Sequence, residues 1–267
     1  MNKKTIYTIL TLICIIGFWA FENFYTPDTY SEPQENGTVH LSIPKYIMPS
    51  STTKSIVHHH NYSLSYHEKY EQAEWVAYTL DKSHLTYDDR KRPHFIEDPK
   101  VKTKSADWRN YRRSGYDRGH LCPAGDRRFS EYAYNETFYT SNITPQNNAF
   151  NAGVWNRLEQ QVRYWAKVYG TVYVITGGVL ESGLKEIGDE DVSVPNYFYK
   201  IVVRGQEKNL KAIGFLFEHE ESTKELRRFT VPIDEIEKRT GIDFFKELNE
   251  TAETKLEEKI QATNWKF

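Results

Sequence analysis

Five short runs of β-forming residues and one long helical segment place the strongest limits on how this chain can fold. Aromatic and β-branched residues dominate the runs, which lie at residues 62–66, 74–80, 171–176, 197–203 and 211–217. Residues 152–169 contain no proline and repeat apolar side chains at helical spacing. Two shorter helical patterns follow at 233–239 and 252–260. The sequence therefore predicts an α+β domain with strands in its core.

The composition allows a sizeable hydrophobic core. Of the 267 residues, 39% are hydrophobic and 15% aromatic, enough for one large domain or two small ones and too apolar for a wholly disordered chain. Residues 22–55 differ, because they are rich in Pro, Ser, Thr, Glu and Asn and show no lasting apolar period. We expect residues 22–55 to be a flexible linker or arm and residues 56–267 to be the folded domain.

The first 21 residues have the pattern of a targeting segment. Two lysines precede an apolar run from residue 5 to residue 20, about the length of a signal-peptide core. The sequence around Phe21 is a poor small-residue cleavage site, so residues 1–21 are interpreted as a signal peptide or an N-terminal membrane anchor. Either interpretation predicts export, with the folded domain periplasmic, secreted or membrane-anchored outside the cytoplasm.

The segment Asp117-Arg118-Gly119-His120 brings an acid, a permanent cation and an imidazole together within four residues. Such neighbours can orient an imidazole and attract an anion, as a general base acting on a phosphate requires. Residues 100–128 contain nine Lys or Arg and three Asp, whereas residues 218–258 contain thirteen acidic and seven basic residues. We therefore expect one basic face on a chain whose formal net charge is −2.

Polar residues also recur along the predicted helix. Asn151, Glu159 and Arg163 are eight and four residues apart. At roughly 100° per residue they follow a slow spiral over about a third of the helix circumference, so all three could border one groove. The Cα atoms of Asn151 and Glu159 would lie roughly 12 Å apart, too far for both side chains to reach one ion directly.

These segments together resemble the DNA/RNA non-specific endonuclease family, which includes secreted bacterial nucleases and mitochondrial endonuclease G. The resemblance rests on residues 117–120, on Ser141-Asn142-Ile143-Thr144-Pro145-Gln146, and on Asn151, Trp155, Leu158 and Glu159. It implies a ββα-metal (His-Me finger) fold with a central, mainly antiparallel sheet flanked by helices. In that fold the histidine lies at the end of the ββ hairpin and the asparagine lies at the following helix.

The resemblance also implies roles for single residues. His120 would be the general base that takes a proton from water, and Asn151 would be the direct protein ligand of a Mg²⁺ ion, with Mn²⁺ also possible. Glu159 would act through metal-bound water. Arg118 and Arg163 would hold or neutralise phosphate through their forked donors.

A further arginine upstream is implied, for which Arg92 is the better candidate and Arg90 remains open. We therefore expect a metal-dependent endonuclease that hydrolyses phosphodiester bonds in DNA and RNA with little base specificity, since it would grip backbone phosphate. The membrane would be a partner only through the N-terminal segment. The family can act as dimers, so a homodimer is possible, although the sequence shows no exposed apolar stripe that favours one.

Two other functions are compatible with parts of the sequence. The basic stretch could serve a non-catalytic nucleic-acid-binding protein at the cell surface. Alternatively, Cys122, two residues from His120, could belong to a cysteine hydrolase. In an extended segment, however, such residues lie about 6.5 to 7 Å apart, so an inert thiol is favoured. The run at residues 58–60, three histidines without spaced partner ligands, is assigned no metal role.

Overall fold

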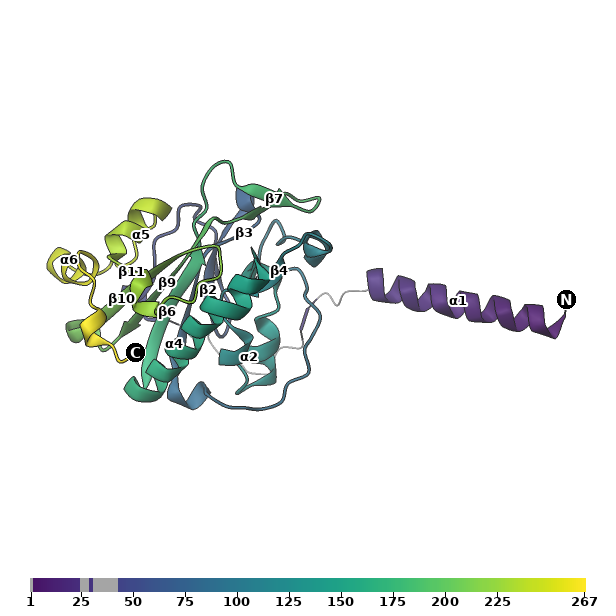
Figure 1. Ribbon diagram of the computed structural model, residues 1–267, viewed down its shortest axis with the longest axis horizontal. Helices are drawn as coiled ribbons and strands as arrows, with labels where there is room; N and C mark the ends of the chain where they lie inside the picture. The colour runs from purple at the N-terminus through teal and green to yellow at the C-terminus, as the bar shows by residue number, and fades with distance from the viewer. Residues whose placement is uncertain (1, 25–28, 31–42) are drawn as a thin grey trace.

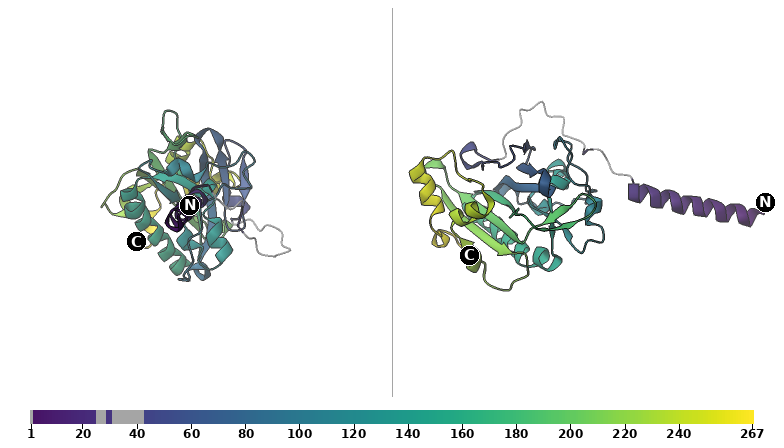
Figure 2. Two further views of the ribbon diagram at one scale, coloured as in Figure 1. Left: turned by 90° about the vertical axis from the view of Figure 1, so that its right-hand side faces the viewer. Right: turned by 90° about the horizontal axis from the view of Figure 1, so that it is seen from above.

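The computed structural model describes residues 2–24, 29–30 and 43–267. Helix α1 (Lys3–Phe24) projects away from the folded body (Figure 1 and Figure 2, right). The stretch Lys3–Phe21 is long and apolar enough to cross a membrane, and none of it is buried. This agrees with the expected targeting or anchoring segment.

A seven-stranded sheet forms the centre of the body, and each neighbouring pair of strands is antiparallel. In spatial order its strands are β1 (Ile56–His58), β2 (Ser63–His67), β3 (Gln72–Asp81), β6 (Thr171–Gly178), β9 (Tyr197–Arg204), β10 (Lys211–Glu218) and β11 (Thr230–Val231). All five predicted strands are confirmed. A small pair, β7 (Lys185–Ile187) and β8 (Val192–Val194), lies outside this sheet.

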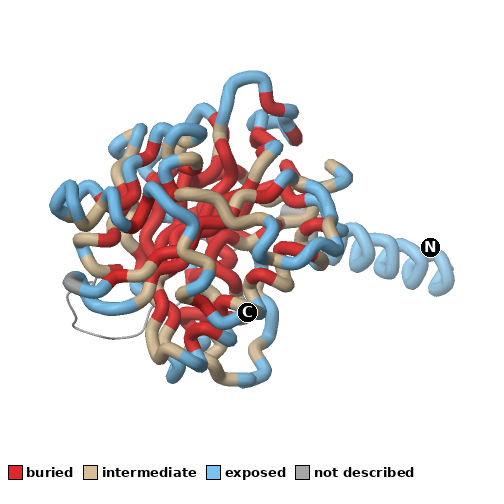
Figure 3. The backbone as a smooth tube through the Cα atoms, turned by 60° about the vertical axis from the view of Figure 1, so that its left-hand side comes forward, coloured by how far each residue is buried: buried red, intermediate tan, exposed pale blue. Residues whose placement is uncertain are grey.

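Helices cover the two faces of the sheet, which explains why its strands are apolar on both sides. In β3, Val76 and Tyr78 pack in the same core as helix α4 (Asn156–Tyr169), whereas Trp75 and Ala77 pack with α5 (Ile233–Thr240) and α6 (Glu250–Glu257). Figure 3 shows this buried interior between exposed outer helices. The two shorter helices expected at 233–239 and 252–260 are thus present, the second beginning at residue 250.

The hairpin that carries the histidine motif is separate from the large sheet. Strand β4 (Asp117–His120) pairs with β5 (Ile143–Gln146), and His120, the last residue of β4, lies opposite Ile143. Helix α2 (Glu131–Glu136) lies within the connection between the two strands. A third apolar cluster, which includes Phe138 and Ile143, supports this hairpin. The implied ββα arrangement is confirmed, because helical residues begin directly after β5.

The long helix is not continuous, contrary to its prediction as one helix over 152–169. It begins as α3 (Asn148–Phe150), passes through a π-helical turn at Asn151–Trp155, and continues as α4. Gly153 interrupts the helical backbone with φ −96° and ψ −111°. Apolar spacing alone does not reveal such a turn, because the core positions on either side remain buried.

The interpretation of residues 22–55 as a linker is wrong for residues 43–55. Ile43 and Ile47 are buried against the sheet. The indole Nε1 of Trp75 donates to the carbonyl of Ser50 at 2.7 Å, and the backbone N–H of Thr52 donates to Glu74 at 3.0 Å. Residues 43–55 are irregular in backbone and are held by side chains from distant segments, so their sequence shows no helical or strand periodicity. The remaining linker residues 25–28 and 31–42 lie outside the described residues.

Candidate active site

A cleft of about 370 Å³ lies between the β4–β5 hairpin and the start of the long helix. Its walls combine cationic, aromatic and oxygen-bearing side chains, namely Arg92, Trp108, Tyr111, Arg112, Tyr116, Asp117, Arg118 and Asn151. The structure therefore brings Arg92, Arg118 and Asn151 together, as expected for three of the predicted site residues.

Two arginines concentrate positive charge in this cleft. The guanidinium of Arg118 lies over the ring of Phe95 at 4.6 Å, and that of Arg92 lies over the same ring at 5.3 Å. Burial, followed by the nearby charge of Arg92, lowers the pKa of Arg118 below its ordinary value. Two cations stacked on one ring form a site that favours a multiply charged anion such as phosphate.

The structure also separates the two candidates for the upstream arginine. Arg90 donates from Nε to the carbonyl of Arg128 at 2.9 Å and pairs with Asp88 at 3.1 Å. Arg90 therefore holds two loop segments together, whereas Arg92 lines the cleft.

His120 is held between aromatic rings in its neutral form. Its ring lies 5.6 Å from that of Phe95 and 4.9 Å from that of Phe138. Burial lowers its pKa to about 3, and the charges of Arg92 and Arg118 add to this effect. The Nε2 atom is buried and, among the described residues, has no hydrogen-bond partner. A neutral imidazole with a free ring nitrogen can accept a proton.

Asp117 contacts the asparagine of the site. Its Oδ2 accepts one hydrogen bond from Nδ2 of Asn151 and one from Nδ2 of Asn148, both at 3.0 Å. The bond to Asn151 fixes the orientation of that amide, so its Oδ1 stays available as an oxygen ligand. An amide oxygen beside a carboxylate is a donor set that suits a hard divalent cation.

Two residues that the sequence analysis did not identify hold the segment around Asn151. The backbone N–H of Asn147 donates to Nε2 of His219 at 2.7 Å, while Nδ1 of His219 donates to the carbonyl of Pro195 at 2.9 Å. The N–H of Val154 donates to Glu221 at 2.8 Å. Both side chains follow β10, and no local pattern marks them, since their partners are about seventy residues away.

Glu159 and Arg163 belong to a neighbouring buried cluster. Arg163 donates to Asp126 at 2.5 Å and to Glu159 at 3.3 Å. Burial raises the pKa of Glu159 to about 7, although Arg163 and Lys200 oppose this shift. Lys200 is itself fully buried beside this carboxylate, and burial lowers its pKa to about 8.

The expectation that Asn151, Glu159 and Arg163 border one groove is corrected by this arrangement. Asn151 lines the cleft with Arg118, whereas Arg163 borders a second groove with Tyr164 and Lys167. The expected spiral assumed 100° per residue throughout. The π-helical turn at Asn151–Trp155 breaks that progression and turns Asn151 away from the direction an unbroken α-helix would give it.

The thiol and the histidine run also have defined surroundings. Cys122 is fully buried in the core, and burial raises its pKa to about 12. A thiol of this kind is a poor nucleophile at neutral pH, which supports the interpretation of Cys122 as inert.

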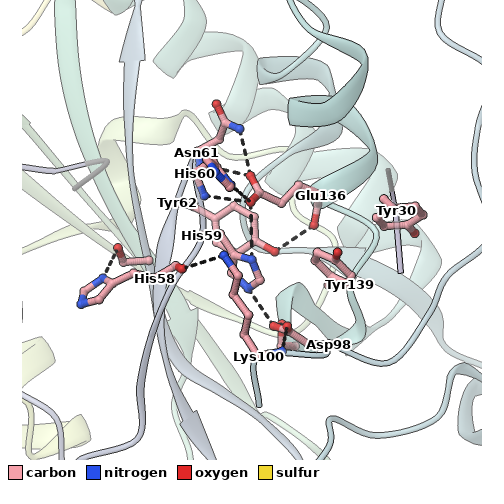
Figure 4. A network of polar contacts seen from close by, with 12 residues as sticks. Tyr30, His58, His59, His60, Asn61, Tyr62, Asp98, Lys100, Glu136 and Tyr139 are labelled. Atoms are coloured by element: carbon pink, nitrogen blue, oxygen red, sulfur yellow. Dashed lines mark hydrogen bonds and ion pairs between the residues drawn. The ribbon is translucent and has the colours of Figure 1, made fainter. Parts of the chain in front are cut away.

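In the run at residues 58–60, His59 is buried. Its Nε2 donates to Asp98 at 2.7 Å, and Glu136 lies 3.5 Å from its Nδ1 (Figure 4).

Comparison with known proteins places this fold and cleft in a family. Residues 41–251 match the DNA/RNA non-specific endonuclease family. The chain is 33% identical over 241 residues to the mitochondrial nuclease EXOG of Danio rerio, a match that covers 81% of this chain and 68% of that protein. It is 35% identical over 202 residues to mitochondrial endonuclease G of Homo sapiens, with 69% and 67% covered.

A solved structure shows the same similarity in three dimensions. A chain in the crystal structure of the EndoG/EndoGI complex superposes with a TM-score of 0.67 and 32% identity, covering 73% of this chain and 86% of that chain. The family match spans most of the folded body and includes the β4–β5 hairpin, the cleft and the long helix. The chain therefore belongs to the DNA/RNA non-specific endonuclease family and is an enzyme of the nuclease class.

Proposed function

We propose that this chain is a divalent-metal-dependent endonuclease that hydrolyses phosphodiester bonds within DNA and RNA. The observation that carries the proposal is the cleft lined by Arg92, Arg118 and Asn151, with the neutral His120 near the two arginines at the end of β4. These groups supply a proton acceptor, an anion clamp and an oxygen ligand. They would contact phosphate and not base edges, which favours little selectivity for base or sugar.

The cleft residues divide the work of hydrolysis. Arg92 and Arg118 hold the phosphate through forked donors and neutralise charge that develops on its oxygens. His120 accepts the proton of the attacking water at Nε2. Asn151, held by Asp117, would bind Mg²⁺ or Mn²⁺, which supplies further charge stabilisation at the scissile phosphate when bound.

Glu159 and Arg163 act from the adjacent cluster. Glu159 would accept hydrogen bonds from water molecules around the cation. Arg163, which is held by Asp126, would keep the Glu159 carboxylate in place and favour its charged form. Arg163 also borders the groove with Lys167, where it could contact a phosphate further along the strand.

The direct test is cleavage of plasmid DNA and of RNA by the full chain, with Mg²⁺ or with a chelator. We expect His120→Ala and Asn151→Ala each to lower the rate about 10²- to 10⁴-fold. His94→Ala removes an exposed imidazole and is the matched control with unchanged activity. Full activity in the chelated sample or in His120→Ala would overturn the mechanism. Salt-sensitive binding without any cleavage would identify a binding protein instead.

We further propose that α1 directs the folded domain out of the cytoplasm, as a signal peptide or as a membrane anchor. Its exposed apolar surface supports this. Determining the N-terminal residue of the protein recovered from the membrane and soluble fractions distinguishes a cleaved from a retained segment. Recovery of the uncleaved chain in the cytoplasmic fraction would contradict export.

A further inference from the structure

Three carboxylates meet on the side of the sheet opposite the long helix. Asp234 and Glu237 lie on α5, and Glu257 is the last residue of α6. One oxygen from each residue lies within 4.8 Å of those of the other two. Helices α5 and α6 lie at the end of the body remote from β4 (Figure 1), so this cluster is separate from the proposed active site.

Glu257 is the member of this cluster that most needs a partner. The residue is only 5% exposed, and within the described residues its Oε1 is buried without a hydrogen-bond partner. Two cations close in sequence to members of the cluster pair with other carboxylates, Arg239 with Glu235 and Lys259 with Glu258. A buried carboxylate oxygen without a donor or a cation is costly, so this oxygen is suited to ligate a cation.

The charged side chains that shift the pKa values of Glu237 and Glu257 are carboxylates. Burial raises the pKa of Glu257 to about 8, and the carboxylates of Glu237 and Glu253 add to the shift. Burial raises the pKa of Glu237 to about 7, with Asp243 and Asp234 adding to it, although the N–H of Phe244 donates to this carboxylate at 2.8 Å. A cation held between the two helices would relieve this repulsion.

We propose that Asp234, Glu237 and Glu257 form a second cation site that binds Ca²⁺ and joins α5 to α6. Carboxylate oxygens are ligands for hard cations. The three oxygens lie within 4.8 Å of one another, close enough to share one Ca²⁺ ion at its usual Ca–O distances of roughly 2.3 to 2.6 Å. Ca²⁺ also accepts irregular geometry and completes its shell with water.

The site would act on stability and not on the chemistry of cleavage. Leu256, next to Glu257, packs in the same core as Ile233 and Ile236 of α5. Binding a cation between the helix ends would hold this packing in place, and it would stabilise the folded state because the unfolded chain does not keep the three carboxylates together.

The experiment measures the melting temperature of the full chain with and without millimolar Ca²⁺ at constant ionic strength. It uses the Asn151→Ala background, so the proposed catalytic ligand cannot contribute. We expect Ca²⁺ to raise the melting temperature by about 3 to 5 °C at concentrations near tenfold above its dissociation constant. Glu257→Gln should abolish this shift. Glu258→Gln, its exposed neighbour, is the matched control and should keep it.

Without Ca²⁺, Glu257→Gln should melt at the same temperature as its parent or higher, since the variant lacks a buried carboxyl group that ionises beside two other carboxylates. Should this variant fail to fold, the exposed Asp234→Asn provides the same comparison. An equal Ca²⁺ shift in parent and cluster variants, or no shift in the parent, would overturn the proposal. A Mg²⁺ shift as large as that of Ca²⁺ would overturn the choice of ion. The melting temperature does not depend on cleavage, so this experiment can reject the cation site without rejecting the nuclease proposal, and the reverse also holds.

Discussion

His120 and Glu159 carry pKa values shifted in opposite senses by the same cause. Burial disfavours the charged form of each, so it lowers the pKa of the imidazole to about 3 and raises that of the carboxyl to about 7. As pH falls from alkaline values, Glu159 therefore loses its charge well before His120 gains one. The acidic limit of activity should belong to the carboxylate.

The pH profile tests this assignment. At low cation concentration we expect the rate to fall as pH drops through about 7, because Glu159 becomes protonated there. In Glu159→Gln the rate should be lower throughout but should no longer fall near pH 7. A decline near pH 6.5 that persists unchanged in Glu159→Gln would instead assign the limit to an imidazole and contradict the prediction.

Cys122 gives the complementary prediction for a residue without a chemical role. Cys122→Ser should leave cleavage of DNA and RNA unchanged, since the thiol is buried and its pKa is about 12. The buried hydroxyl should lower the free energy of unfolding by about 1 to 3 kcal/mol. Both quantities are accessible from a plasmid assay and a denaturant titration. A folded variant that had lost activity would favour the cysteine hydrolase.

At the scale of elements, the π-helical turn presents Asn151 to the cleft, and Gly153 makes that turn possible. A Cβ atom on Gly153 would lie 1.7 Å from Oε2 of Glu221. This carboxylate accepts the N–H of Val154, so a methyl group would displace the Glu221 side chain and break this hydrogen bond. The glycine is favoured because the Glu221 carboxylate approaches its backbone closely.

We expect Gly153→Ala to lower the free energy of unfolding by about 1 to 3 kcal/mol. The displaced Asn151 should also slow cleavage by about tenfold or more. Denaturant titration and plasmid cleavage measure the two effects. Adding Glu221→Ala removes the obstructing carboxylate and should restore part of the stability relative to Gly153→Ala alone. Unchanged stability and activity in Gly153→Ala would show that the turn tolerates a side chain.

At the scale of the whole molecule, a buried ion network ties together segments distant in sequence (Figure 4). His59 follows β1, Glu136 ends α2, and Asp98 accepts a hydrogen bond from Ser141, which precedes β5, at 2.5 Å. The two carboxylates raise the pKa of His59 to about 9 despite its burial. The folded protein therefore holds a buried imidazolium at neutral pH.

This network predicts how stability depends on pH. The folded pKa of His59 lies above its ordinary value of 6.5, so its contribution is complete below pH 6.5 and is lost as pH rises through about 9. The loss should be on the order of 3 kcal/mol in the free energy of unfolding. Urea titrations of the wild type at several pH values measure it. His59→Gln should reduce this decline, whereas His60→Gln, at a partly exposed neighbour, should not. An equal decline of the free energy of unfolding in His59→Gln and in the wild type would contradict this assignment to His59.

Local signals in the sequence predict the strands, the helices and the histidine motif. Runs of β-forming residues predicted five strands of the central sheet, and a helical period with helix start and stop signals predicted three covering helices, because these signals are local. The residues at 117–120 and 141–146 also identified the family. These short segments remain recognisable since the proposed chemistry needs particular groups at fixed spacing along one hairpin and the helix after it.

Which side chains meet follows from the tertiary structure and not from these local signals. Asp117 contacts Asn151 and not its neighbour His120, Arg92 and not Arg90 lines the cleft, and residues 43–55 pack on the sheet. The turn at Gly153 separates Asn151 from Arg163. These outcomes depend on contacts between distant segments and on burial, which also sets the pKa values of the site. No local pattern in the sequence shows these long-range contacts or the burial of each side chain.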